Sequence, residues 1–424
     1  MVTVVPRLSI RPGPASTGLL SLPWERPLAE WDATEVALRD VPVGPSRHLV
    51  RFVEIADRLY ALKEMPPRVA RQEYDVLRKL QRRRLPAVAP VGMVEQPHGE
   101  AVLITEYLEG SWQYRRLFLR LPPDLVRHRE RLLDAMAMLL VELHRNGIYW
   151  GDCSLANTLF KRDGQVLQAY LVDAETSRVH PILSDGQRAY DLDILVENVT
   201  GGLMDVAARL EQDVDFDEHH RAASTVAERY RGLWAELHCE PTIGFSDRLQ
   251  VAAHIRRIND LGYAVDEVTL SPTQVGDQLS VSVAVAGRQF HAEQLREATG
   301  LAVGEGQATV LLNDLRSYAA ELQRRQLRPL SLNEAGVRWL AEVYRPGLDR
   351  VRRLADAGAD LTQAFCDLLE VRWLMSEEAG RDVGTSVALQ ALARRSTPPN
   401  SAAQLMVLEA ATGSFPPIRL PRND

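Results

Sequence analysis

Runs of hydrophobic residues divide the first hundred positions of the chain into strand-like segments. Two of these runs are rich in β-branched and aromatic residues and are separated only by Ala56 and Asp57, a spacing typical of a β-hairpin. The pair Pro66-Pro67 then begins a helix, because apolar side chains recur at helical spacing as far as Leu80. Strands are expected at 49–55, 58–64, 88–95 and 101–107. These elements predict a β-rich N-terminal lobe.

The pattern becomes mostly helical beyond this lobe. A long apolar-periodic segment ends at Asn146-Gly147, a typical helix stop. Helices are expected at 124–146, 190–212, 217–238, 246–261, 291–299 and within 331–395, and strands at 148–150, 158–161, 167–172, 264–270 and 279–286. The expected division is a loose arm at 1–17, a β-rich lobe at 18–108, a helical lobe with a functional loop at 109–240, and a mostly α domain with a small αββα piece at 241–424. The fold class is therefore α+β.

Composition and charge exclude several classes of protein. The net charge is −7 and no basic stripe is present, so we do not expect nucleic acid as a partner. The most apolar stretch, residues 192–210, contains Asp193, Glu197 and Arg209, too many charges for a membrane span. The N-terminus lacks an apolar run of secretory length, and the three cysteines are far apart, so a cytoplasmic location is expected.

Lysine is unusually scarce in this chain. Only Lys63, Lys79 and Lys161 are lysines, so arginine supplies 47 of the 50 basic residues. This bias is typical of a GC-rich genome, but it makes each remaining lysine worth examining. A compact ammonium and a planar guanidinium are not interchangeable in a tight phosphate site.

Three polar signals indicate a candidate site. Asp152 and Asn157 lie five residues apart in the loop after the long helix, and Asp173 follows the next hairpin. Carboxylate and amide oxygens at such positions can hold Mg²⁺, which keeps most of its waters and accepts substrate phosphates as ligands. Lys63 lies on an N-terminal strand, with Glu73 ten residues later in the next helix. Each signal alone also has a structural reading, as a turn residue, a surface lysine or a solvated acid.

Together these residues resemble the protein-kinase fold. The closest resemblance is to atypical bacterial kinases of the lipopolysaccharide-kinase and aminoglycoside-phosphotransferase type, and to a poorly characterised bacterial kinase-like family with its own C-terminal domain. The resemblance covers roughly residues 40–235 and implies a two-lobed fold. Leu59-Tyr60-Ala61-Leu62-Lys63 matches the strand lysine motif, Glu73 its helix partner, Ile104–Leu108 the hinge, Tyr149–Asp152 with Asn157 the catalytic loop, Asp173 the metal-binding aspartate, and Asp191 the residue that braces the loop.

The resemblance implies specific roles for these residues. Lys63, Glu73 and Asp152 would be catalytic, and Asn157 and Asp173 would bind the metal. The backbone at Glu106 and Leu108 would hold adenine. The implied cofactors are ATP and Mg²⁺.

Two departures from the kinase pattern are visible. No G-x-G-x-x-G motif precedes Lys63, and the loop with Gly44, Ser46 and Arg47 is the candidate substitute for binding phosphate. Asp173 is followed by Ala174-Glu175 in place of the usual Phe-Gly. Only about 18 residues separate Asp173 from Asp191, which leaves little room for a regulated activation segment.

The expected function is ATP- and Mg²⁺-dependent transfer of a phosphoryl group to a hydroxyl. The acceptor is not identified by the sequence and is a small molecule, a glycan or a protein. The alternative is a nucleotide-binding pseudokinase that acts as a regulator or scaffold, favoured by the degraded phosphate loop. The C-terminal domain carries no recognisable chemistry and is the candidate surface for a homodimer.

Overall fold

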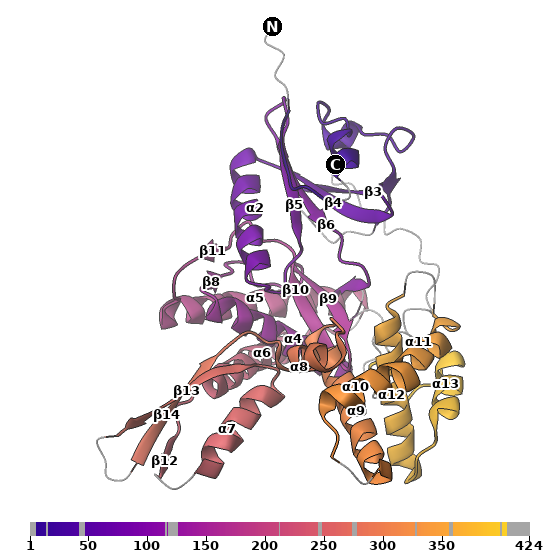
Figure 1. Cartoon of the computed structure of the whole chain (residues 1–424). Coiled ribbons are helices and arrows are strands. Elements are labelled where there is room, and N and C mark those ends of the chain that lie inside the picture. The colour runs from indigo at the N-terminus through magenta and orange to yellow at the C-terminus, as the bar shows by residue number, and fades with distance from the viewer. Residues whose placement is uncertain are drawn as a thin grey trace.

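The chain folds into two lobes and a C-terminal region that extends below them (Figure 1). The computed structural model describes residues 6–13, 16–41, 47–114, 117, 126–211, 213–244, 248–273, 278–326, 329–355, 359–398 and 401–404. Helices and an antiparallel sheet occupy separate lobes, so the predicted α+β class with a two-lobed arrangement and a mostly α C-terminal region is confirmed.

The upper lobe is built on a six-stranded sheet in the order β1-β5-β6-β4-β3-β2. All neighbouring strands pair antiparallel. β6 lies inside the sheet between β5 and β4, and five of its six residues are buried. One face is covered by the helix α2, and the other by the segment that contains Trp24 and Trp31. The elements are β1 Arg7–Ile10, α1 Ser16–Leu20, β2 Leu38–Arg39, β3 Leu49–Ile55, β4 Arg58–Met65, α2 Pro67–Arg82, β5 Pro90–Glu95 and β6 Ala101–Glu106.

One expectation for the N-terminus is corrected. Residues 7–10 of the expected loose arm form β1, whose four residues pair with β5 from Arg7↔Glu95 to Ile10↔Gly92. Flanking Pro6, Pro12 and Gly13 give this segment the composition of a loop, and the strand exists only because β5 offers an open edge.

The helical lobe surrounds a long buried helix, α4, which packs against β10 and α6. The lobe also contains a three-stranded antiparallel sheet in the order β10-β9-β7 and the two-stranded pair β11-β8, both below the six-stranded sheet. The elements are β7 Ser111–Gln113, α4 Val126–Arg145, β8 Ile148–Tyr149, β9 Thr158–Asp163, β10 Val166–Leu171, β11 Arg178–Val179, α5 Asp185–Arg209 and α6 Phe216–Leu237.

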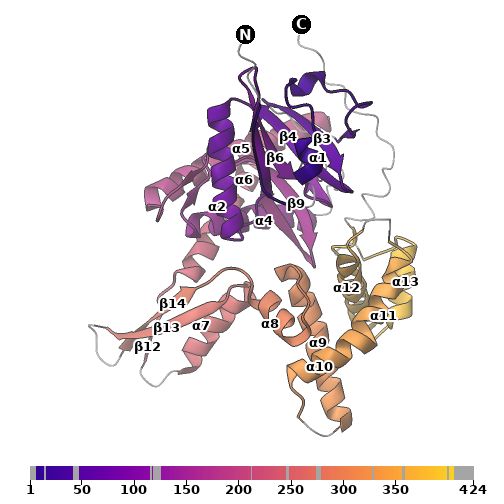
Figure 2. The same ribbon diagram turned by 45° about the horizontal axis from the view of Figure 1, so that its top comes forward.

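The C-terminal region forms two groups of elements that diverge below the helical lobe (Figure 2). The first is a small sheet with α7, and the second is a helical bundle. The elements are β12 Thr242–Gly244, α7 Arg248–Asp260, β13 Val265–Pro272, β14 Gln278–Val285, α8 Phe290–Thr299, α9 Glu305–Gln326, α10 Leu332–Trp339, the π-helix Leu340–Tyr344, α11 Arg345–Arg352, α12 Leu361–Ala379 and α13 Thr385–Ala393.

The sequence pattern changes near residue 240, but the boundary between the two hydrophobic cores does not lie there. Ile258 and Tyr263, from the first C-terminal group, are fully buried in the same core as α4, α5 and α6. Arg145 reinforces this contact by stacking over the Tyr263 ring at 4.9 Å and donating to the Val285 carbonyl at 2.6 Å. Helices α8 to α13 enclose a separate core around Trp339. The domain boundaries given above therefore stay predictions.

The second group is joined to the helical lobe through the β9–β10 turn. The Asp163 carboxylate accepts hydrogen bonds from the backbone N–H groups of Gly306 and Gln307, at 2.8 and 2.9 Å, and so caps the first turn of α9. Gln363 bonds both the N–H and the carbonyl of Gly164. The buried guanidinium of Arg162 donates to Asp367 at 2.7 Å. We name this set of contacts the hairpin clamp.

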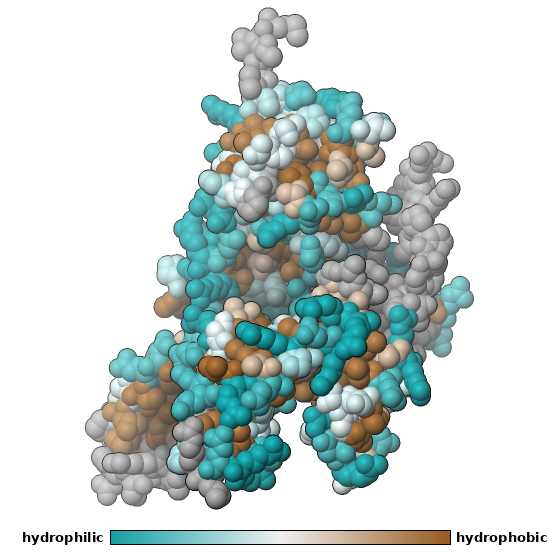
Figure 3. Space-filling view, turned by 45° about the vertical axis from the view of Figure 1, so that its right-hand side comes forward, coloured by the Kyte–Doolittle hydropathy of each residue, from teal (hydrophilic) through white to brown (hydrophobic). Residues whose placement is uncertain are grey.

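The surface is polar with scattered hydrophobic side chains. Figure 3 shows brown patches interrupted by teal over the visible face. Among the aromatic residues of the C-terminal helices, Trp339 and Tyr344 are buried, whereas Trp373 is 59% exposed. None of the described helices combines the length and apolarity that crossing a bilayer requires.

Candidate functional site

Lys63 forms the centre of a buried charged cluster between the lobes. Lys63 lies on β4. Glu73 lies in the second turn of α2, and a single residue separates α2 from β4. The Lys63 Nζ atom donates to Glu73 Oε2 at 3.0 Å and to Asp173 Oδ2 at 2.8 Å. The sequence predicts Glu73 as the partner of Lys63 and Asp173 as a metal ligand, and the structure brings all three side chains together.

Burial determines the protonation behaviour of this cluster. Glu73 is almost completely buried, and the loss of solvation raises its pKa to about 7, although Lys63 acts in the opposite direction. Burial also lowers the pKa of the Lys63 ammonium, but attraction to Glu73 and Asp173 outweighs it, so the net shift is upward. Lys63 therefore stays positively charged near neutral pH.

Asp152 and Asn157 lie in the loop that follows β8. Asn157 Nδ2 donates to Asp152 Oδ2 at 2.9 Å, and Asn198 Nδ2 on α5 donates to Asp152 Oδ1 at 3.1 Å. Both carboxylate oxygens are thus oriented by amide groups, while the side chain stays only partly buried. Such a carboxylate is fixed in direction and still reachable by a substrate hydroxyl.

A buried aspartate on α5 holds the backbone of this loop. Asp191 accepts hydrogen bonds from the N–H groups of Trp150 and Gly151, at 2.7 and 2.8 Å, and contacts His144 Nε2 at 3.0 Å. These contacts match the bracing role expected of Asp191. Gly151 has φ +81°, and a Cβ there would lie 3.1 Å from the Thr176 carbonyl, which explains a glycine immediately before Asp152.

The β9–β10 hairpin brings the two expected metal ligands to one place. Asn157 precedes β9 and Asp173 follows β10, and the Val172 N–H donates to the Asn157 carbonyl at 3.1 Å. Antiparallel pairing thus places both residues at the same end of the hairpin. Their amide and carboxylate oxygens are hard donors suited to Mg²⁺.

Glu175 adds a third carboxylate beside Asp173 and Glu73. Ligand oxygens of these three residues lie within 4.8 Å of one another. His48 Nε2 contacts Glu175 Oε2 at 3.0 Å, and Gln72 donates to the Glu175 carbonyl at 2.9 Å. The residue that replaces the kinase glycine is therefore held by both α2 and the start of β3.

The two expected adenine-binding positions, Glu106 and Leu108, lie at the end of β6 and just after it. The Leu108 carbonyl accepts from the Ser111 hydroxyl at 2.6 Å. Arg47 is exposed just before β3. Gly44 and Ser46, the other expected phosphate contacts, lie outside the described residues. The expected contacts to adenine and phosphate therefore stay predictions.

Three residues of the site were not found from the sequence. Asn198 lies in the middle of α5, where nothing distinguishes it from a solvated amide. His48 and Glu175 meet across 127 positions, so no local spacing indicates their contact. Asn198 has one available signal, because it lies on the same face of α5 as Asp191, two turns later.

One family of known proteins matches the part of the chain that contains these residues. Residues 51–216 match the model of the lipopolysaccharide kinase (Kdo/WaaP) family, a stretch that includes Lys63, Glu73, Asp152, Asn157 and Asp173. Over this stretch the chain is similar to the lipopolysaccharide kinases, and a second, C-terminal domain follows it. Residues 232–396 match a domain of unknown function (DUF4032). The match to the kinase family supports a kinase-like phosphotransferase in general terms.

The remaining comparisons are less informative. One solved structure, described as WaaP in complex with acyl carrier protein, is 19% identical to the lipopolysaccharide-kinase-like chain. The match covers 54% of this chain and 98% of that one, with a TM-score of 0.35. No curated protein matches the chain.

Proposed function

We propose that this protein transfers the γ-phosphoryl group of ATP to a hydroxyl, with Mg²⁺ as the metal. The observation that carries the proposal is the position of Lys63, which contacts Glu73 on α2 and Asp173 after β10 at the same time. A scaffold has no chemical need for a buried lysine shared by two carboxylates at this position. The family match over residues 51–216 supports the same reaction class.

The residues present fit ATP and a divalent ion. Asn157 and Asp173 offer neutral and anionic oxygen donors at one end of the hairpin, and Mg²⁺ needs only a partial protein shell. When bound, ATP would supply the phosphoryl group and the metal ion would neutralise phosphate charge. Lys63 would contact the phosphates through its ammonium, and Glu73 would keep that ammonium in place.

Asp152 is assigned the contact with the acceptor hydroxyl. Its carboxylate is directed by Asn157 and Asn198 and stays partly open. It would orient the hydroxyl and accept its proton as the phosphoryl group is transferred. Positioning and charge neutralisation would supply most of the rate enhancement.

The test is Asp152→Asn, assayed for Mg²⁺-dependent ADP release and, separately, for ATP binding by calorimetry. We expect turnover to fall by about 10²-fold or more, the usual contribution of a positioned base, with ATP affinity nearly unchanged. The matched control is Asp193→Asn, an exposed aspartate on α5 that should leave both readouts unaltered. Unchanged ADP release in Asp152→Asn would remove Asp152 from the proposed role.

A second candidate function is nucleotide binding without transfer. The contact between His48 and Glu175 favours it, because it ties the start of β3 to the segment after Asp173, where kinases keep a mobile glycine. Thermal stabilisation by ATP, with no ADP release on any acceptor and no dependence on Mg²⁺, would support this pseudokinase in place of the phosphotransferase.

A further inference from the structure

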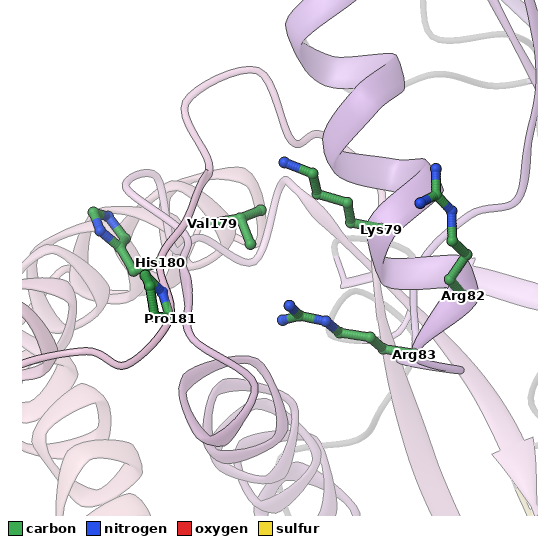
Figure 4. Close-up of a pocket in the computed structure, with 6 residues that line it drawn as sticks. All are labelled: Lys79, Arg82, Arg83, Val179, His180 and Pro181. Atoms are coloured by element: carbon green, nitrogen blue, oxygen red, sulfur yellow. The ribbon is translucent and has the colours of Figure 1, made fainter.

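A basic hollow lies behind the candidate site, between the C-terminal end of α2 and the segment after β11. It has a volume of about 440 Å³ and is lined by Lys79, Arg82, Arg83, Val179, His180 and Pro181 (Figure 4). Four of the six lining residues are basic and none is acidic. Lys79 and Arg83 extend from α2 toward the opposite wall.

The charges in this hollow are not balanced by carboxylates. Among the described residues, none of the four basic side chains forms an ion pair, and the one contact found is from Arg83 to the Asn146 carbonyl. Elsewhere on α2, Arg71 pairs with Glu95 and Arg78 stacks on Tyr74. Two other cations of the helix therefore have partners.

Helix geometry makes the absence of carboxylates costly. Lys79 lies three and four residues before Arg82 and Arg83, so all three share one face and repel one another. The dipole at a helix C-terminus favours cations there, which is the simplest reason for basic residues at this end. It does not account for the way Lys79 and Arg83 extend into a hollow whose lining contains no carboxylate.

The far wall is rigid. The His180 N–H donates to the Gly147 carbonyl at 2.8 Å, and a Cβ on Gly147 would lie 2.1 Å from the His180 carbonyl. Both the positive φ of Gly147, +72°, and this close approach to the His180 carbonyl require a glycine. β11 also pairs with β8 next to this wall. The hollow is thus a fixed edge of the helical lobe facing the end of α2.

We propose that this hollow binds a soluble small molecule that carries two or more phosphate groups. Guanidinium groups match phosphate oxygens in paired hydrogen bonds, and an ammonium supplies a compact charge beside them. The volume lies within the range of ordinary ligand sites. Because the walls belong to α2 and to the segment after Asp173, the bound anion would hold α2 against the helical lobe.

The test is calorimetric titration of the full chain with tripolyphosphate in the absence of Mg²⁺. We expect Lys79→Gln/Arg83→Gln to weaken binding at this site by at least about tenfold, the loss of charge-assisted hydrogen bonds. Lys79→Gln/Arg82→Gln serves as a second variant, because among the described residues Arg82 makes no hydrogen bond to the helical lobe and its loss leaves the Arg83–Asn146 contact intact. It should also weaken binding.

Two controls separate this site from other cations. Arg324→Gln/Arg325→Gln removes two exposed arginines from the last turn of α9 and should leave binding unchanged. Lys63→Met should leave tripolyphosphate binding at the hollow unchanged, although it removes the ammonium from the candidate site. The proposal is overturned if the wild-type chain does not bind the probe, if Lys79→Gln/Arg83→Gln binds as tightly as wild type, or if Lys63→Met abolishes all binding.

Discussion

Lys63 differs from the other two lysines of the chain in what surrounds it. Its ammonium is enclosed by two carboxylates, whereas Lys161 lies on β9, away from this cluster. A guanidinium is larger and planar, so it cannot occupy the same position between Glu73 and Asp173 without moving one of them.

This contrast gives a prediction at the scale of single residues. Lys63→Arg should lower kcat/KM for ATP by about tenfold or more, because the compact charge beside the phosphates is displaced. Lys161→Arg should stay within about twofold of wild type, since a half-buried strand position tolerates either cation. Steady-state ADP release measures both. Equal losses in the two variants would mean that lysine scarcity carries no functional information.

At the scale of elements, the hairpin clamp joins the candidate site to the C-terminal bundle. Asp163 caps a helix that begins far downstream in the chain, and its two N–H contacts are charge-assisted. The same hairpin ends at Asn157 and Asp173. A loosened clamp would therefore loosen the expected metal ligands.

Asp163→Ala should reduce the free energy of unfolding by about 2 kcal/mol, the cost of a lost cap with charged hydrogen bonds. It should also weaken Mg²⁺-dependent nucleotide binding by a few-fold. The matched control is Asp215→Ala, which removes the N-cap of α6 but touches no part of the hairpin. Denaturant unfolding and calorimetry measure the two effects. If both variants weaken nucleotide binding equally, the clamp has no special role.

The same clamp explains which elements the sequence predicts well. Strands β3 and β4, helix α2 and the hairpin that ends at Asp173 follow local patterns, and all are found near their expected bounds. Helix α9 is not predicted, because its N-terminal cap is Asp163 and no capping side chain precedes it in its own sequence. Likewise, the candidate site is predictable where spacing is local, as for Asp152 and Asn157, and not where partners are distant.

At the scale of the whole molecule, the two C-terminal groups contact the kinase-like lobes in different ways. The small sheet and α7 contribute Ile258 and Tyr263 to the core of the helical lobe. The helical bundle has its own core and meets the lobe through the polar clamp. The sequence could not reveal this division, because a helical or strand pattern does not indicate which core an element joins.

A chain ending at residue 240 should therefore be less stable than one ending at residue 289. The shorter chain loses two fully buried side chains, each contributing about 1.5–3 kcal/mol to stability. Thermal unfolding of both chains beside the full-length protein measures the difference. If the shorter chain unfolds at the same temperature as the longer one, the first C-terminal group does not complete the core of the helical lobe.

The β9–β10 hairpin has one more consequence. Each of its strands has six residues, which at about 3.3 Å per residue gives a rod about 20 Å long between the clamp and the cleft. Two ligands that both shift the position of this hairpin are thermodynamically linked, and the linkage is reciprocal. A protein that binds the bundle and changes the nucleotide affinity by a given factor has its own affinity changed by the same factor when the nucleotide binds. Protein partners sought with nucleotide present and absent should therefore differ in abundance, even though no nucleotide contacts them.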